Sequence, residues 1–261
     1  MELTSLGFYI GHFFIAYYGL MIIVGIGAAA AIGWYQTRRY HLSFDTLILI
    51  SAVAGLFGII GAKILYILVS LDQIEIKRLL EPAYFNSLMQ GGFVFYGGLL
   101  GALAGFLFCH SVLKLPVRSY ISKALPCIPA AHGFGRLGCS LVGCCYGCPY
   151  DGMFSITYTD SLFAPNHTPL FPIQGMEAIL EFAISIFLLI YINRLSGKSP
   201  IKWYLSLYAT ARFILEFFRY DSEERGMFFF FSTSQCISLL ILLALIALQI
   251  FNSLKKAQSR R

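Results

Sequence analysis

Apolar stretches of about 20 residues recur along the whole chain, which is the length that an α-helix needs to cross the hydrocarbon core of a bilayer. The chain has 261 residues, of which 58% are hydrophobic and only 12% are charged. The pattern therefore predicts an all-α polytopic membrane protein, folded as one integral membrane domain over residues 1–261. The length rule places about seven spans, at residues 12–34, 47–71, 93–112, 121–142, 173–192, 203–218 and 234–251.

Basic residues concentrate in one set of the loops between these spans. The positive-inside rule assigns such loops to the cytoplasm, so we expect the N-terminus outside and the C-terminus inside. Residues 147–170 would then form a small extracytoplasmic cap. No basic face with interleaved aromatic residues accompanies the net charge of +6, so no nucleic-acid partner is expected. The basic loop residues are Arg38, Arg39, Lys114, Arg118, Lys123, Arg194, Lys198, Lys202, Lys255, Lys256, Arg260 and Arg261.

Two arginines, Arg136 and Arg212, lie inside predicted spans. A charge at mid-depth of a bilayer costs roughly 2.5 kcal/mol or more, and an intramembrane ionisable residue is a functional candidate by default. A guanidinium group binds phosphate in a bidentate manner. The two arginines therefore predict a pocket for an anion such as a lipid phosphate.

The sixth predicted span carries Tyr208, Arg212 and Glu216 at steps of four, which places them on one helix face. One interpretation is an Arg–Glu pair that only locks helices together. A buried pair is weak evidence for stability, however, because both charges must be desolvated. A functional use is therefore favoured.

His132, Arg136 and Cys139 share a face of the fourth predicted span. His132 could be an interhelical hydrogen bonder or a functional group beside Arg136. The glycines in this span favour a distorted or re-entrant segment, which is tolerated at membrane depth only where it is buried or lines a cavity. They are Gly133, Gly135, Gly138 and Gly143.

Other ionisable or reactive groups lie in or beside the spans. Glu177 and Glu181 share a face of the fifth span, and Tyr96 lies in a glycine-rich stretch whose small residues suit close helix packing. Packing does not explain Tyr96, because a buried phenol needs a polar partner.

Four cysteines fall within ten residues, and their chemistry stays open at this point. A disulfide is favoured, because oxidation is normal outside the cytoplasm. A zinc site, a reactive thiolate beside Arg136 and simple packing are the alternatives. We assign no metal ion and no cofactor to the chain. The four residues are Cys139, Cys144, Cys145 and Cys148.

Nearly end to end, the chain resembles the prolipoprotein diacylglyceryl transferase family of bacterial inner membranes. The most specific motifs are Gly135-Arg136-Leu137-Gly138 and Ala211-Arg212-Phe213-x-x-Glu216-Phe217-x-Arg219. The others are Tyr17-Tyr18-Gly19-Leu20-Met21, Gly61-Ala62-Lys63-Ile64-Leu65-Tyr66, Gly97-Gly98-Leu99-Leu100-Gly101 and Pro172-x-Gln174-x-x-Glu177.

The resemblance implies a multi-pass inner-membrane enzyme that moves diacylglyceryl from phosphatidylglycerol to the lipobox cysteine of a preprolipoprotein. It implies that Arg136 and Arg212 bind or activate the lipid phosphate, that Glu216 positions Arg212, and that Tyr18 and Tyr208 line the site. The motif residues Gln174, Glu177 and Arg219 are expected to bind substrate as well.

Three departures from the family pattern concern the polar groups around the phosphate site. Tyr96 stands where the family usually has a histidine that is a proposed base. Cys139, Val142 and Cys144 stand where the family has Asn, Asn and Glu, and Phe171 replaces a histidine. We expect His132 to act as a replacement base, with Tyr96 as a second catalytic candidate.

These departures keep two other functions open. One is a related lipid-group transferase with a different acceptor. The other is a membrane thiol-redox or metal-binding protein on the same scaffold.

Overall fold

The computed structural model describes residues 2–195, 199–220, 227–228 and 230–258. The protein is an all-α polytopic membrane protein, as predicted, and the described strands are short. The chain forms two compact units. The larger unit comprises Met1–Gly33 and Ser122–Arg261, and the smaller unit is Trp34–Ile121.

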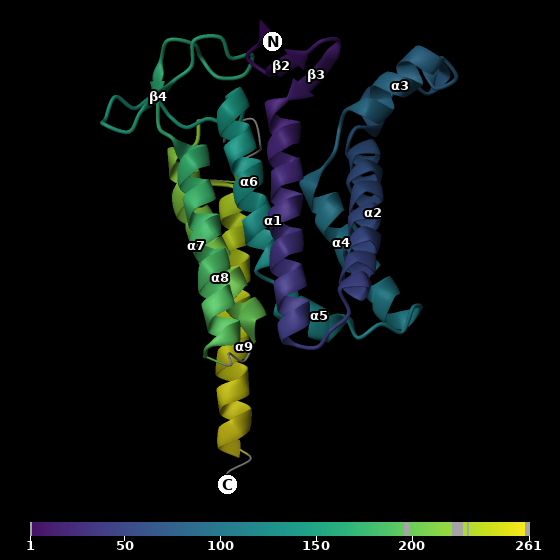
Figure 1. Cartoon of the computed structure of the whole chain (residues 1–261), viewed down its shortest axis with the longest axis vertical. Helices are drawn as coiled ribbons and strands as arrows, with labels where there is room; N and C mark the ends of the chain where they lie inside the picture. Colours follow the sequence, from purple (N-terminus) through teal and green to yellow (C-terminus); the bar gives the residue numbers. More distant parts are fainter. Residues whose placement is uncertain (1, 196–198, 221–226, 229, 259–261) are drawn as a thin grey trace. The chain divides into compact units, whose positions relative to one another are not determined.

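In the larger unit, α7 (Ile173–Asn193) packs against both α6 (Cys127–Val142) and α8 (Pro200–Leu215), and α8 packs against α9 (Thr233–Gln258) (Figure 1). The first turns of α1 (Tyr17–Arg39) also approach α6, since a Cβ added to Gly138 would meet Tyr18 and Met21. A 3₁₀ turn, η3 (Glu216–Phe218), continues α8.

The smaller unit is built on the pairing of α2 (Phe44–Val69) with α4 (Phe95–Ser111). Their contact uses the small residues that the sequence predicted, because a Cβ on Gly61 would collide with the backbone of Gly97 and Gly101. The connection between these helices contains the 3₁₀ turns η1 (Leu71–Gln73) and η2 (Ile76–Arg78) and the helix α3 (Pro82–Gln90). A short helix, α5 (Val117–Ala124), follows α4 across the boundary of the units.

This close contact leads to a stability prediction within one helix. Gly61→Val should destabilise the protein by about 1–3 kcal/mol, the usual cost of overpacking a tight contact. Gly55→Val is the matched control in α2, because a Cβ at Gly55 meets no atom within 4 Å. Thermal unfolding in detergent compares the two variants. Equal melting temperatures would contradict the packing role of Gly61.

Antiparallel strand pairs lie outside the helices. At the N-terminus, β1 (Glu2–Leu3), β2 (Gly7–Ile10) and β3 (Phe13–Ala16) form one sheet in that order. The cap segment, residues 147–170, holds β4 (Ile156–Thr157) and β5 (Pro169–Leu170), which pair with each other. The strands β6 (Met227–Phe228) and β7 (Phe231–Ser232) precede α9.

The structure has a helix in each of the seven predicted spans. Within the described residues, four helices are long and apolar enough to cross a membrane, namely Tyr17–Arg39, Phe44–Val69, Ile173–Asn193 and Thr233–Lys255. Of the residues used to predict the orientation, Lys198, Arg260 and Arg261 lie outside the described part of the chain.

Three details of the predicted spans were wrong. The first span begins at Tyr17 rather than residue 12, because β2 and β3 form a hairpin that turns at Gly11, where φ is +62°. The fourth is interrupted before Cys127, since Pro126 lacks the N–H that a continuous helix would need. The glycine-rich part was expected to be distorted or re-entrant, but Cys127–Val142 is a continuous helix.

Candidate functional site

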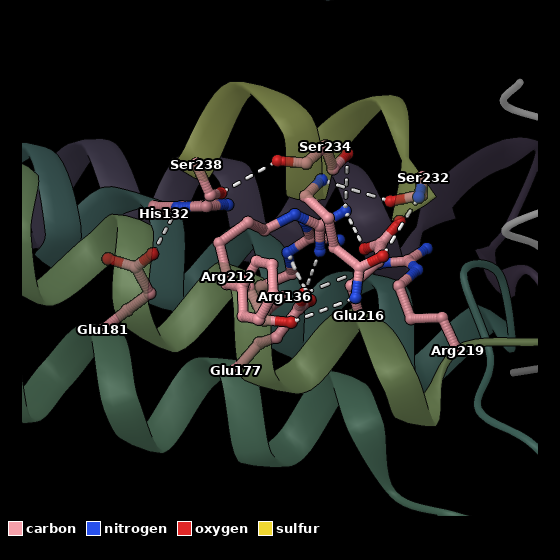
Figure 2. Close-up of polar contacts among 12 residues, drawn as sticks. His132, Arg136, Glu177, Glu181, Arg212, Glu216, Arg219, Ser232, Ser234 and Ser238 are labelled. Carbon is pink, nitrogen blue, oxygen red and sulfur yellow. Dashed lines mark hydrogen bonds and ion pairs between the residues drawn. The ribbon is translucent and has the colours of Figure 1, made fainter. Parts of the chain in front are cut away.

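Three arginines and two glutamates meet in the larger unit, with Glu177 of α7 at their centre (Figure 2). Glu177 Oε2 lies 2.8 Å from Arg136 Nε of α6, and Glu177 Oε1 lies 2.6 Å from Arg212 Nη1 of α8. Arg212 Nη2 lies 2.6 Å from Glu216 Oε2. Arg219 Nη1 also approaches Glu177 Oε1, at 3.5 Å. We call these five residues the arginine cluster.

The arginine cluster carries an excess positive charge. Three guanidinium groups and two carboxylates leave one positive charge uncompensated within it. The side chains are largely withdrawn from solvent, with exposed fractions of 15% for Arg136, 11% for Arg212 and 0% for Arg219. Because charges interact more strongly where water is excluded, this excess charge favours a bound anion.

The three arginines are held differently. Arg212 has both terminal nitrogens engaged, since Nη2 also donates a hydrogen bond to Ser234 Oγ of α9 at 3.3 Å (Figure 2). Among the described residues, Arg136 is paired with Glu177 through Nε, and its side chain lines a cavity. Arg136 is therefore placed to contact a ligand, whereas Arg212 is fixed and Arg219 is fully buried.

His132 contacts a second carboxylate one turn before Arg136 on α6. Its Nδ1 lies 2.8 Å from Glu181 Oε1 of α7, and its ring centroid lies 5.9 Å from that of Tyr208. Since Nδ1 faces a carboxylate, the neutral ring carries its proton there and leaves Nε2 as an acceptor. This geometry is suited to a general base.

One cavity connects His132 with the arginine cluster. Its volume is about 20 Å³, and roughly 10–15 Å³ is needed to hold one water molecule. At this volume the cavity can hold water but not a lipid headgroup. It is lined by His132, Arg136, Glu177, Leu180, Glu181, Ile184, Tyr208, Ala211, Arg212 and Leu215.

The remaining predicted site residues lie outside this lining. Gln174 is buried and donates a hydrogen bond from Nε2 to the Cys144 carbonyl at 3.0 Å, so it joins α7 to the chain after α6. Tyr18 is 45% exposed on α1 and packs beside Gly138. Tyr96 belongs to the smaller unit, where its ring makes an edge contact with Phe95.

The structure records all seven cysteines as thiols rather than disulfides. The sulfur atoms of Cys139, Cys144 and Cys145 lie within 4.8 Å of one another, and Cys148 is outside this group. The choice between a disulfide and a thiol cluster stays a prediction. Hydrogen bonds from Cys139 and Cys144, together with the charge of Arg219, lower the pKa of the Cys145 thiol.

Sequence reasoning missed how these pairs connect. It identified Glu177 and Glu181 as members of one helix face, but it did not predict that Glu177 would serve three arginines or that Glu181 would hold His132. Ser234 was also missed. The four-residue spacing within α7 was the available signal for the two glutamates.

Comparison with known proteins places this site in a family context. The family model described as prolipoprotein diacylglyceryl transferase matches residues 6–251. The chain belongs to the prolipoprotein diacylglyceryl transferase family. Its matched region contains every residue of the arginine cluster, along with His132, Glu181 and the clustered cysteines.

Relatives within this family match the chain along most of its length. Phosphatidylglycerol--prolipoprotein diacylglyceryl transferase 2 of Clostridium perfringens is 35% identical over 91% of both chains. The enzyme of Clostridium tetani is 34% identical over 90% of this chain and 91% of its own. That of Dehalococcoides mccartyi is 27% identical over 99% of this chain and 97% of its own. The names of these bacterial relatives imply phosphatidylglycerol and prolipoprotein substrates.

Proposed function

We propose that this protein transfers the diacylglyceryl group of phosphatidylglycerol to a thiol, the lipobox cysteine of a preprolipoprotein. The thiol sulfur forms a C–S bond with the glycerol carbon that carries the phosphate, and the C–O bond to the phosphate breaks. Glycerol phosphate leaves with the bonding electrons, and the thiol proton passes to a base. Family membership and the buried arginine cluster support this reaction.

The observation that carries the proposal is the excess positive charge beside the cavity. A phosphodiester has one negative charge, and the departing phosphate monoester gains a second as the C–O bond breaks. Fixed guanidinium groups stabilise charge that develops in a transition state without having to reorganise. In this proposal Arg136 contacts the phosphate, while Glu177, Glu216, Ser234 and the buried Arg219 hold the cluster in position.

The cavity must enlarge before the headgroup can bind, because its described volume is about 20 Å³. Arg136 moves as the headgroup enters, because it has fewer described partners than Arg212, and the cluster is fixed again once the lipid is bound. Transfer of labelled diacylglyceryl to a lipobox peptide by the purified protein tests the proposal. A well-folded protein that transfers nothing from phosphatidylglycerol would overturn it.

His132 is the proposed base for the acceptor thiol. His132→Ala should lower kcat by about 10²–10⁴-fold, which is the usual contribution of general acid–base catalysis. Glu181→Gln should have a smaller effect, because it removes the charge that orients the ring but leaves Nε2 in place. His110→Ala, at the end of α4, is the control. Full activity of His132→Ala would exclude this role, and Tyr96→Phe would then test the second catalytic candidate.

We further propose that the protein lies in the bacterial inner membrane with its N-terminus outside and its C-terminus in the cytoplasm. The distribution of basic residues supports this orientation. A reporter that is active only in the cytoplasm, fused to the C-terminus, should be active. A silent but expressed fusion would contradict the orientation.

A further inference from the structure

The three clustered thiols are brought together by the way α6 ends. Cys139 lies in the last turn of the helix, and Gly143 closes that turn by donating its N–H to the Cys139 carbonyl at 2.9 Å. Gly143 has φ +79°, and a Cβ there would collide with Ser161. The left-handed conformation and the lack of space both require glycine. The chain then turns back, which brings the sulfur atoms of Cys144 and Cys145 close to that of Cys139.

We infer that Cys139, Cys144 and Cys145 form a binding site for one thiophilic divalent cation of the zinc class. Zinc–thiolate bonds are about 2.3 Å long, so three sulfurs around one ion lie about 4 Å apart. The three sulfurs here lie within 4.8 Å of one another without any ion. Only a small contraction is therefore needed for all three to reach the same metal ion.

The charges near the thiols are suited to such a complex. Three thiolates and one divalent cation carry a net charge of −1. Arg219 interacts with Cys145 by charge and by a hydrogen bond, and the charge of Arg136 acts on both Cys139 and Cys145. Positive groups beside the site offset this negative charge.

The three thiols differ in their exposure to solvent. Cys139 is buried, whereas Cys144 and Cys145 are half-buried. With three protein ligands, the ion keeps a fourth position for water or for a thiol from outside, as open zinc sites do. Nothing in this inference depends on the transferase reaction, and metal binding is measured without it.

Cys148 provides a matched control in the same segment. Its sulfur is outside the group of three, and its backbone is held by hydrogen bonds with Phe218 and Phe171. A site formed by the three clustered thiols must therefore be insensitive to Cys148→Ser. If the whole cysteine-rich segment bound metal in a general way, Cys148→Ser would weaken binding as well.

The experiment is a titration of the detergent-purified protein with Cd²⁺, in a phosphine reductant that keeps thiols reduced. Thiolate-to-metal charge-transfer absorption reports binding, and Zn²⁺ competes as the second probe. We expect one ion per chain. Cys139→Ser, Cys144→Ser and Cys145→Ser should each weaken binding by more than the roughly 10–100-fold lost when a group that merely orients a ligand is removed. Cys148→Ser should bind as the wild type does.

A second measurement needs no variant and so does not depend on how the variants fold. Bound Zn²⁺ should protect Cys144 and Cys145 of the wild-type protein from alkylation, as read residue by residue by mass spectrometry. The absence of charge-transfer absorption, equal weakening by Cys148→Ser, or alkylation unchanged by Zn²⁺ would each overturn the site. A wild-type protein that binds metal as expected but transfers no diacylglyceryl would contradict only the proposed function.

Discussion

Arg136→Ala should lower the rate of diacylglyceryl transfer by about 10²–10³-fold, the cost of removing one donor that stabilises charge in a transition state. Arg136 lines the cavity, and it is Nε of this residue that pairs with Glu177. Its terminal nitrogens are therefore the proposed donors to the phosphate. The loss should fall mainly on kcat, because the charge that they stabilise is largest as the C–O bond breaks.

Arg136→Lys separates charge from geometry. A lysine keeps the positive charge but lacks the planar fork that binds a phosphate in a bidentate manner, so it should restore only part of the activity. Arg38→Ala is the control for the loss of an arginine, since Arg38 lies at the end of α1 over the ring of Trp34. The measurement is the initial rate of transfer to a lipobox peptide. Near-normal kcat in Arg136→Ala would exclude the proposed phosphate contact.

Glu177→Ala should destabilise the protein by about 3–5 kcal/mol, as expected when one partner of a buried ion pair is removed. The expected effect is large because Glu177 is the carboxylate that Arg136, Arg212 and Arg219 share. Without it, three cations would remain close together with only Glu216 to compensate them. Transfer activity should be lost together with stability.

The matched control is an exposed carboxylate that also pairs with an arginine. Glu75 lies 3.5 Å from Arg78, and their side chains are 63% and 47% exposed. An exposed pair contributes about 0–1 kcal/mol, so Glu75→Ala should change little. Unfolding of both variants by heat or by added SDS in detergent gives the comparison. A Glu177→Ala protein as stable as Glu75→Ala would show that the cluster does not stabilise the fold.

The helices could be predicted because hydrocarbon thickness sets the length of apolar segments. The pairing of Arg212 with Glu216 follows from their spacing of four on one helix. The irregular features followed from local chemistry that hydropathy does not report. Pro126 interrupts an otherwise apolar stretch, and the hairpin that turns at Gly11 replaces the start of the first predicted span.

The long-range pairs could not be predicted for a different reason. A sequence shows that Glu177 and Glu181 share a helix face, but not which helix that face meets. Only the packing of α7 between α6 and α8 determines that Glu177 meets three arginines and that Glu181 meets His132. The sequence showed four nearby cysteines but not which sulfurs meet, since that depends on the turn at Gly143.

The shared carboxylate of Glu177 also bears on how the protein would choose among the lipids around it. Arg212 and Arg219 already face internal carboxylates, so a headgroup gains little by replacing those contacts. The single surplus positive charge of the arginine cluster then determines which headgroup binds more favourably. A headgroup with net negative charge neutralises that surplus, whereas a zwitterionic headgroup brings its own ammonium group toward three arginines. Discrimination between anionic and zwitterionic phospholipids would thus arise from the charge balance of the resting site rather than from any contact with the rest of the headgroup.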